Sequence, residues 1–195
     1  MKPASVIAVL VLLGAVTLGA WVVSPDGPPT AAPATETPGG DPTPRLPYVE
    51  PPPDPLVVPP DALVFERTGA PGKFAGSGVL TDEEVELAEE NGVVRITGRI
   101  TRGDAGVTLG VWRLATDSDP RPALAALDGL YERGGHELEP TDHPGLLLRR
   151  RGNAFHGHYA HGTDVFRVEA YGSGAAPALA ELVDRQLALT PAEGS

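Results

Sequence analysis

The sequence contains no cysteine, and it is poor in basic and aromatic residues. Without cysteine the chain has no disulfide framework, no thiolate zinc site, no iron–sulfur cluster, no cysteine nucleophile and no lipidated cysteine. Basic residues number 15 against 26 acidic ones, which gives a net charge of −11. A nucleic-acid-binding protein needs a clustered basic footprint to neutralise phosphates, so we expect no nucleic-acid partner.

Charge is absent altogether from residues 4–23, an apolar run of 20 residues that follows Lys2. As an α-helix this run would rise about 30 Å, the thickness of the hydrocarbon core of a bilayer. A cleaved signal peptide is the alternative, but Leu18 would lie at the −3 position of the best cleavage site, and Trp21 suits the membrane interface. We therefore expect residues 1–23 to be a single-pass transmembrane signal anchor, with the N-terminus inside and the rest exported.

Proline is concentrated in the next segment, where residues 24–60 hold 14 of the 22 prolines. Such a segment carries too little apolar surface to offset the entropy of ordering it, and proline favours extended polyproline II conformations. We expect residues 24–60 to be a disordered Pro-rich linker that holds the following domain away from the membrane. Residues 61–195 are numerous enough for one hydrophobic core and form the predicted extracytoplasmic domain.

The pattern of residues 61–195 predicts an α+β domain. Alternating apolar and polar residues predict strands, and capping signals with helical spacing predict helices. A capping box, Thr81-x-x-Glu84, opens one helix, and Gly134-Gly135 ends another. The strands are expected at residues 63–66, 93–100, 107–114, 146–150, 153–160 and 164–171, and the helices at 82–91, 120–133 and 176–189.

A short sequence echo suggests how these elements are arranged. Residues 122–127 read PALAAL and residues 177–182 read PALAEL, each time after a predicted strand hairpin. Two strand–strand–helix units would account for the echo, and chance similarity between two Ala- and Leu-rich helices is the alternative. In both cases we expect an antiparallel sheet with the helices packed on one face.

The histidines are the one local concentration of chemistry, because three of the five lie within residues 155–161. On a strand, His156 and His158 point to the same face. Together with His161 or Asp164 from the following turn, they match the three-ligand pattern of a zinc site with one open position. The sequence therefore offers His156, His158 and His161 as candidate metal ligands.

A second interpretation needs no metal. The strand would expose a polar face, and its imidazoles would lie across from Arg167 and Glu169. HExxH and related metal motifs are absent, so we assign no cofactor, with zinc as the alternative. Ser77 lacks the spacing of a nucleophile elbow, and we predict no catalytic residue.

Two charge clusters are candidate contact surfaces. Six acidic residues crowd the predicted helix at 82–91, which is either a solvated helix or a docking face for a basic partner. Three consecutive arginines at 149–151 are either a solvated strand end or a contact for phosphate or anionic glycan.

The layout predicts a function in the bacterial cell envelope. Thirteen arginines against two lysines, with abundant alanine and glycine, are typical of a GC-rich bacterium. We expect a membrane-anchored extracytoplasmic binding or assembly protein, not catalytic, that contacts an envelope protein or another ligand. A metal-assisted hydrolase using His156, His158 and His161, with Asp164 or Glu169 as acid or base, is the alternative. A purely structural wall-associated protein is a third interpretation.

Overall fold

The computed structural model describes residues 54–103 and 105–193. The predicted signal anchor at residues 1–23 lies outside this range, as do residues 24–53 of the predicted linker. Among the described residues no helix is both long and apolar enough to span a membrane.

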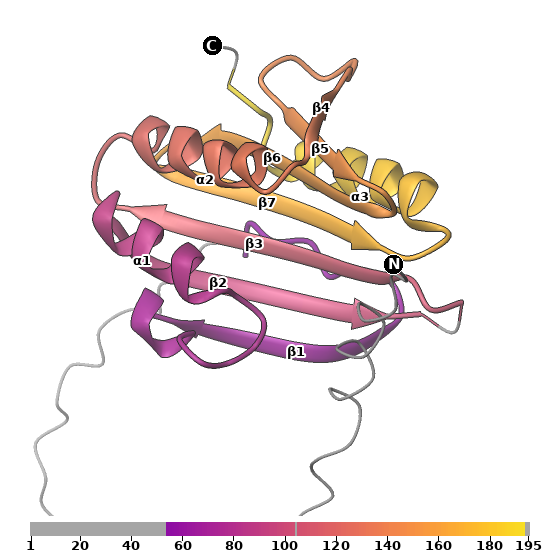
Figure 1. Ribbon diagram of the computed structural model, residues 1–195, viewed down its shortest axis with the longest axis horizontal. Helices are drawn as coiled ribbons and strands as arrows, with labels where there is room; N and C mark the ends of the chain where they lie inside the picture. Colours follow the sequence, from indigo (N-terminus) through magenta and orange to yellow (C-terminus); the bar gives the residue numbers. More distant parts are fainter. Residues whose placement is uncertain (1–53, 104, 194–195) are drawn as a thin grey trace, which may run out of the picture. The chain divides into compact units, whose positions relative to one another are not determined.

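Seven strands form one antiparallel sheet, which confirms the predicted α+β class (Figure 1). The strand order is β1-β2-β3-β7-β6-β5-β4, so that two consecutive meanders meet where β3 pairs with β7. The predicted strands and helices are all present, and a short strand, β4, and a 3₁₀ turn, η1, were not predicted. The elements are β1 (Ala62–Gly69), η1 (Pro71–Lys73), α1 (Asp82–Glu90), β2 (Val93–Arg102), β3 (Thr108–Thr116), α2 (Arg121–Arg133), β4 (Glu137–Glu139), β5 (Leu147–Arg151), β6 (Ala154–His161), β7 (Asp164–Tyr171) and α3 (Ala175–Leu189).

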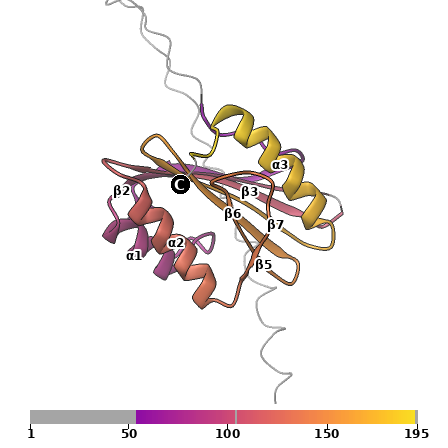
Figure 2. The ribbon, with the colours of Figure 1, turned by 90° about the horizontal axis from the view of Figure 1, so that it is seen from above.

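Helices cover both faces of the sheet, with α1 and α2 on one side and α3 on the other (Figure 2). The expectation that all helices pack on one face is therefore wrong. The reason lies in the central strands: Leu109 and Val111 of β3 pack toward α3, whereas Trp112 and Leu114 pack toward α1 and α2. A strand that is apolar on both sides needs cover on both sides.

The two hairpin–helix units, β2–β3–α2 and β6–β7–α3, are consequently not structural copies of each other. If the two units were copies, a twofold rotation would exchange the antiparallel neighbours β3 and β7. The axis of that rotation is perpendicular to the sheet, so the rotation would leave α2 and α3 on the same face. They lie on opposite faces (Figure 2). The sequence echo is a similarity between two helices rather than a repeated fold unit.

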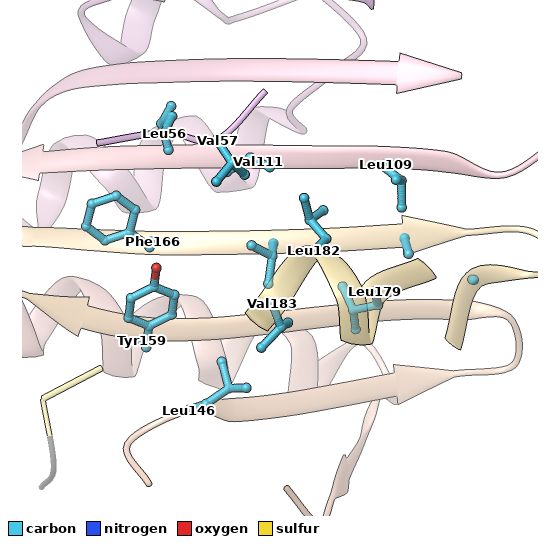
Figure 3. Packing of buried hydrophobic residues seen from close by; sticks show 13 residues of the cluster. Leu56, Val57, Leu109, Val111, Leu146, Tyr159, Phe166, Leu179, Leu182 and Val183 are labelled. Atoms are coloured by element: carbon cyan, nitrogen blue, oxygen red, sulfur yellow. The ribbon is translucent and has the colours of Figure 1, made fainter. Parts of the chain in front are cut away.

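The face covered by α3 holds the larger apolar core (Figure 3). Leu182 and Val183 of α3 pack against the sheet, and the ring of Tyr159 stacks on Phe166 with their centroids 5.3 Å apart. The Tyr159 hydroxyl lies 2.7 Å from the hydroxyl of Thr190, so its buried polar end is hydrogen-bonded. This face is an ordinary protein core.

Residues 54–58 form a short strap that packs into the same core, ahead of the expected domain start at residue 61. Leu56 and Val57 are buried beside Val111 (Figure 3). The buried amide of Gln186 on α3 accepts a hydrogen bond from the backbone of Val57 (3.0 Å), and Arg99 donates to the carbonyl oxygen of Leu56 (2.8 Å). The end of the predicted linker is thus part of the folded domain.

The opposite face begins as an apolar core under α1 and changes character toward β6. Phe74, Ile96 and Trp112 pack together with the inner sides of α1 and α2. The predicted capping box at Thr81 and Glu84 is formed. The chain leaves α2 through Gly135, whose φ of 80° suits glycine. On the next strands of the sheet, β7 and β6, the same face is polar. This polar region is the candidate site.

Candidate functional site

Glu169 of β7 lies at the centre of the polar region, with only 4% of its side chain exposed. Trp112 donates a hydrogen bond from Nε1 to Oε1 (2.7 Å), and the Tyr171 hydroxyl donates to Oε2 (3.1 Å). Burial alone would raise the pKa of Glu169, but the Arg167 guanidinium, His156 and Trp112 hold the pKa at about 2. Glu169 is therefore an ionised carboxylate inside the protein.

Glycines on the neighbouring strands make room for this carboxylate and for the indole. Gly110 is the register partner of Glu169, and a Cβ at position 110 would lie 2.4 Å from Glu169 Oε1. Gly98 is the register partner of Trp112, and a Cβ there would lie 2.2 Å from the indole. The sheet is shaped to hold Trp112 and Glu169 against it.

Arg167 is the buried cation of the region and joins the sheet to both helices above it. Its Nε lies 3.2 Å from Glu169 Oε2, and its Nη1 donates to Glu84 Oε1 (2.5 Å) and to the Tyr131 hydroxyl (3.0 Å). The guanidinium also lies over the Trp112 ring, 4.8 Å from the centroid. One arginine thereby contacts a carboxylate of the sheet, a carboxylate of α1 and a phenol of α2.

Glu84 is the acidic residue of α1 that turns inward. It is the third residue of the helix, where its side chain accepts a hydrogen bond from the backbone N–H of Thr81 (2.7 Å). Burial raises the pKa of Glu84, but Arg167, the Thr81 backbone and the Tyr131 hydroxyl together lower it below its usual value. Glu84, Arg167 and Glu169 therefore make a buried group of two carboxylates and one guanidinium, with one negative charge in excess.

Three imidazoles gather around the ring of Tyr131. The ring centroids of His136, His156 and His158 lie 5.1, 4.2 and 4.8 Å from that of Tyr131. His156 is 3% exposed, and its Nδ1 points at Glu169 Oε2 from 3.6 Å, too far for a hydrogen bond. His136, which stands just before β4, was not among the predicted site residues.

His158 is enclosed completely, and neither ring nitrogen has a hydrogen-bond partner among the described residues. Burial, together with the charges of His156 and Arg167, lowers its pKa well below the usual value. The pKa of His136 is also lowered, by burial and by the nearby His156 and arginines. His158 and His136 are therefore neutral at pH 7.

A cavity of about 740 Å³ opens on one side of this cluster, between the first turn of α1, the last turn of α2 and the sheet. Its polar walls come from His136, His156, Arg167 and Tyr171, together with Tyr131 and Glu84. Asp82 and Glu83 also line it. A volume of this size is typical of small-molecule sites, which combine apolar walls with a few placed polar groups.

The predicted metal ligands are only partly brought together. His156 and His158 share the buried face, as the alternation predicted, and lie across from Glu169 and Arg167. His161 lies at the end of β6, where its ring packs on Phe166 of the α3-side core and its Nδ1 lies 2.8 Å from the carbonyl oxygen of Pro191. The described residues include no group of three His, Cys, Asp or Glu that could hold a metal ion.

Two further sequence-based expectations concern charged residues. Asp164, the other candidate third ligand, pairs with Arg113 at 2.6 Å. The face of β6 expected to be exposed is buried, because α2 covers it. Arg149 is likewise not solvated: it is 7% exposed and makes two hydrogen bonds, of 2.8 and 2.6 Å, to Asp128 of α2.

The sequence contained one signal that these polar residues form a common site. Arg167, Glu169 and Tyr171 alternate along β7 with apolar residues, and the His-x-His of β6 lies beside them. Polar residues on one face of a central strand indicate a buried polar site, but only once the strand order is known.

Comparison with known protein families, curated proteins and solved structures gave no significant match to this chain.

Proposed function

We propose that this chain is a membrane-anchored extracytoplasmic binding protein of the bacterial cell envelope, in which the cavity beside Arg167 and His156 holds a small-molecule ligand. The observation that carries this proposal is the buried charged group at the wall of the cavity. Burying ions costs more free energy than packing apolar side chains of the same volume, so stability alone does not account for it. Perturbed ionisable groups in a cleft are typical of functional sites.

The anchoring part of the proposal rests on the sequence. The uncharged run at residues 4–23 and the Pro-rich residues 24–60 support a domain exported and held away from the membrane. The chain has no cysteine, so a single Ser173→Cys variant can report its side of the membrane, because Ser173 is exposed. We expect a membrane-impermeant maleimide to label this variant in intact cells. Labelling only after lysis would contradict export.

A binding function agrees better with the geometry than the hydrolase alternative does. That alternative required His156, His158 and His161 to share one metal ion, and His161 packs on the other side of the sheet. The charged groups at the cavity are instead already paired with one another, as in a rigid, preformed binding site.

Ligand-observed NMR of the full chain in detergent tests the binding function, using a library of small polar molecules of mixed charge. Ala154 lines the cavity, and Ala154→Trp would fill part of it. Ala180→Trp, at an exposed position of α3, is the matched control. We expect hits that persist in the control and disappear in Ala154→Trp. An absence of hits, or hits that survive Ala154→Trp, would refute a ligand site in this cavity.

A further inference from the structure

We infer that the ligand is an uncharged amide whose carbonyl oxygen accepts a hydrogen bond from Nη2 of Arg167. This inference rests on the proposed binding function and adds the chemical class of the ligand. Three features of the cavity wall lead to it: the free donors of Arg167, the balance of charge around them, and the apolar residues in the same cavity.

Arg167 gives the wall a donor whose role does not change with pH, because a guanidinium can only donate hydrogen bonds. Within the described part of the chain, both of its hydrogen bonds start from Nη1, toward Glu84 and the Tyr131 hydroxyl. Its Nε is enclosed and has no hydrogen-bond partner there, although Glu169 Oε2 lies 3.2 Å away. Nη2 is neither hydrogen-bonded nor enclosed, so its two N–H groups are free for a ligand in the cavity that Arg167 lines.

The first turn of α1 adds donors to the same wall. The capping box uses the backbone N–H groups of Thr81 and Glu84, whereas those of Asp82 and Glu83 have no partner within the helix. Asp82 and Glu83 line the cavity. A ligand that fits this wall therefore has to bring an acceptor. His156 does not decide the question, because a histidine ring can donate or accept.

The charges around these donors leave no positive surplus that would favour an anion. Three carboxylates and two guanidinium groups stand in the wall or against it: Glu84, Glu169, Asp82, Arg167 and Arg151. Glu83 is left out of this count because Arg133 pairs with it at 3.4 Å, and His136 is neutral because its pKa is lowered. The amino end of α1 and the carboxyl end of α2 both border the cavity, and their partial charges have opposite signs. A protonated His156 would bring the total only to zero, so an uncharged acceptor is favoured over a carboxylate or phosphate.

Apolar side chains in the same cavity suit the rest of an amide. The cavity is also lined by Val79, Leu80, Leu130 and Ala154. Small-molecule sites combine such walls with a few placed polar groups. The amide group has a dipole of about 3.5 D, which makes its carbonyl oxygen a strong acceptor without a net charge. An amide with short apolar substituents therefore satisfies Arg167 without placing a second anion beside Glu84 and Glu169.

Three small probes of similar size test the inference: N-propylacetamide, ethyl propyl ether and pentanoate. They are titrated into the full chain in detergent near neutral pH and followed by ligand-observed NMR. We expect N-propylacetamide to bind about tenfold more tightly than the ether, which lacks the carbonyl group, because one hydrogen bond to a charged donor is lost. We expect pentanoate, which brings a negative charge, to bind more weakly than the amide.

A conservative variant tests the role of Arg167. Arg167→Lys keeps a positive charge between Glu84 and Glu169 but removes the Nη2 donors, so it should weaken the binding of N-propylacetamide about tenfold. Arg113→Lys is the matched control, because Arg113 is also a strand arginine paired with a carboxylate, Asp164, but lies outside the cavity lining. It should leave binding unchanged. Circular dichroism shows whether each variant folds.

A second readout covers the case in which Arg167→Lys does not fold. In protein labelled with ¹⁵N-arginine, N-propylacetamide should move the guanidinium resonances of Arg167 and leave those of the exposed Arg121 in place. An ether or pentanoate that bound as tightly as the amide, or an Arg167 signal that did not move, would overturn the amide assignment while leaving the binding function intact. Amide binding that Ala154→Trp does not affect would overturn both. Failure of the amide alone beside other library hits would overturn only the amide assignment.

Discussion

On the α3 face of the sheet the buried side chains are mainly apolar, whereas the α1/α2 face changes from apolar to charged on passing from β3 to β7. On the α3 face Gln186 and Thr190 have hydrogen-bond partners, whereas the buried hydroxyl of Thr101, the register partner of Leu109, has none among the described residues. On the α1/α2 face both nitrogens of His158 have no hydrogen-bond partner among the described residues. The clearer difference is that one face buries mainly apolar side chains and the other buries a group of ions and imidazoles. The predictions below test that division.

The largest effect is expected at Arg167, the single cation between two buried carboxylates. Arg167→Met removes the charge that faces Glu84 and Glu169 and leaves both carboxylates inside the protein without a counter-ion. We expect a loss of about 3–5 kcal/mol in the free energy of unfolding. Urea denaturation at pH 7, followed by far-ultraviolet circular dichroism, measures it.

The control for this variant removes the carboxylate charges as well. In the triple variant Arg167→Met/Glu84→Gln/Glu169→Gln no buried charge remains uncompensated in this group, and most of the lost stability should return. Leaving a buried polar group without its partner costs at least about 1 kcal/mol of the free energy of unfolding. A smaller loss in the single variant would show that water reaches the two carboxylates.

On the other face, Leu182→Ala should reduce stability without affecting the cavity. Leu182 is 1% exposed in the core under α3, and its truncation should cost about 2–5 kcal/mol. Leu189→Ala on the same helix is the control, because Leu189 is exposed and its replacement should change stability by less than about 0.5 kcal/mol. If folded Leu182→Ala lost binding in the cavity, the two faces would not be independent.

A smaller effect is expected where the sheet approaches the indole of Trp112. Gly98→Ala places a Cβ where the indole now lies, so Trp112 has to move, and overpacking of this kind costs about 1–3 kcal/mol. In a Trp21→Phe background, Trp112 is the only tryptophan, and its fluorescence reports the displacement. Gly129→Ala in α2 is the opposite control: its Cβ meets only Arg133 at 3.4 Å, and it should stabilise the helix by about 0.5–1 kcal/mol. Unchanged emission and stability in Gly98→Ala would contradict the close packing.

Most of the secondary structure could be predicted from local signals. The capping box at Thr81, the glycines that end α2 and the alternation in β6 and β7 depend on near neighbours in sequence, and each is present in the structure. Val94 shows the limit of alternation. Alternation along residues 93–100 predicts Val94 on the same face as Ile96, but a bulge between Val93 and Arg95 shifts the register, and Val94 is 53% exposed.

The site could be predicted only in part, because it depends on which strands become neighbours. The sequence placed His156 and His158 on one face opposite Arg167 and Glu169, and the strand register confirms these pairs. Nothing local showed that α2 would cover that face or that Glu84, more than 80 residues away, would supply a second carboxylate. His156 and His158 would be surface groups if β6 were an edge strand, but β6 is an inner strand and they are buried. Whether they are read as surface or site residues therefore depends on the strand order.

The smallest effect is a gain in stability at His158, whose ring is buried next to the site without contributing a bond to it. His158→Leu removes two unpaired nitrogens from the interior and should stabilise the protein by about 1–2 kcal/mol. The gain should grow as the pH falls. The lowered pKa keeps folded His158 neutral, while the unfolded chain takes up a proton below its ordinary pKa of about 6.5, so the wild type loses stability in acid.

Melting temperatures at pH 7 and pH 5 measure both parts of this prediction, and the carboxylate contributions cancel because they are common to the two proteins. His143→Leu is the control: His143 is partly exposed and pairs with the exposed Asp184 (3.1 Å), and losing such a solvent-screened pair should change the melting temperature little at either pH. If His158→Leu instead destabilised the protein at pH 7, a hydrogen-bonded water or ligand would have to satisfy the imidazole. His158 would then belong to the site. The boundary between residues that serve stability and residues that serve binding would no longer follow the two faces of the sheet, but would have to be drawn residue by residue along β6.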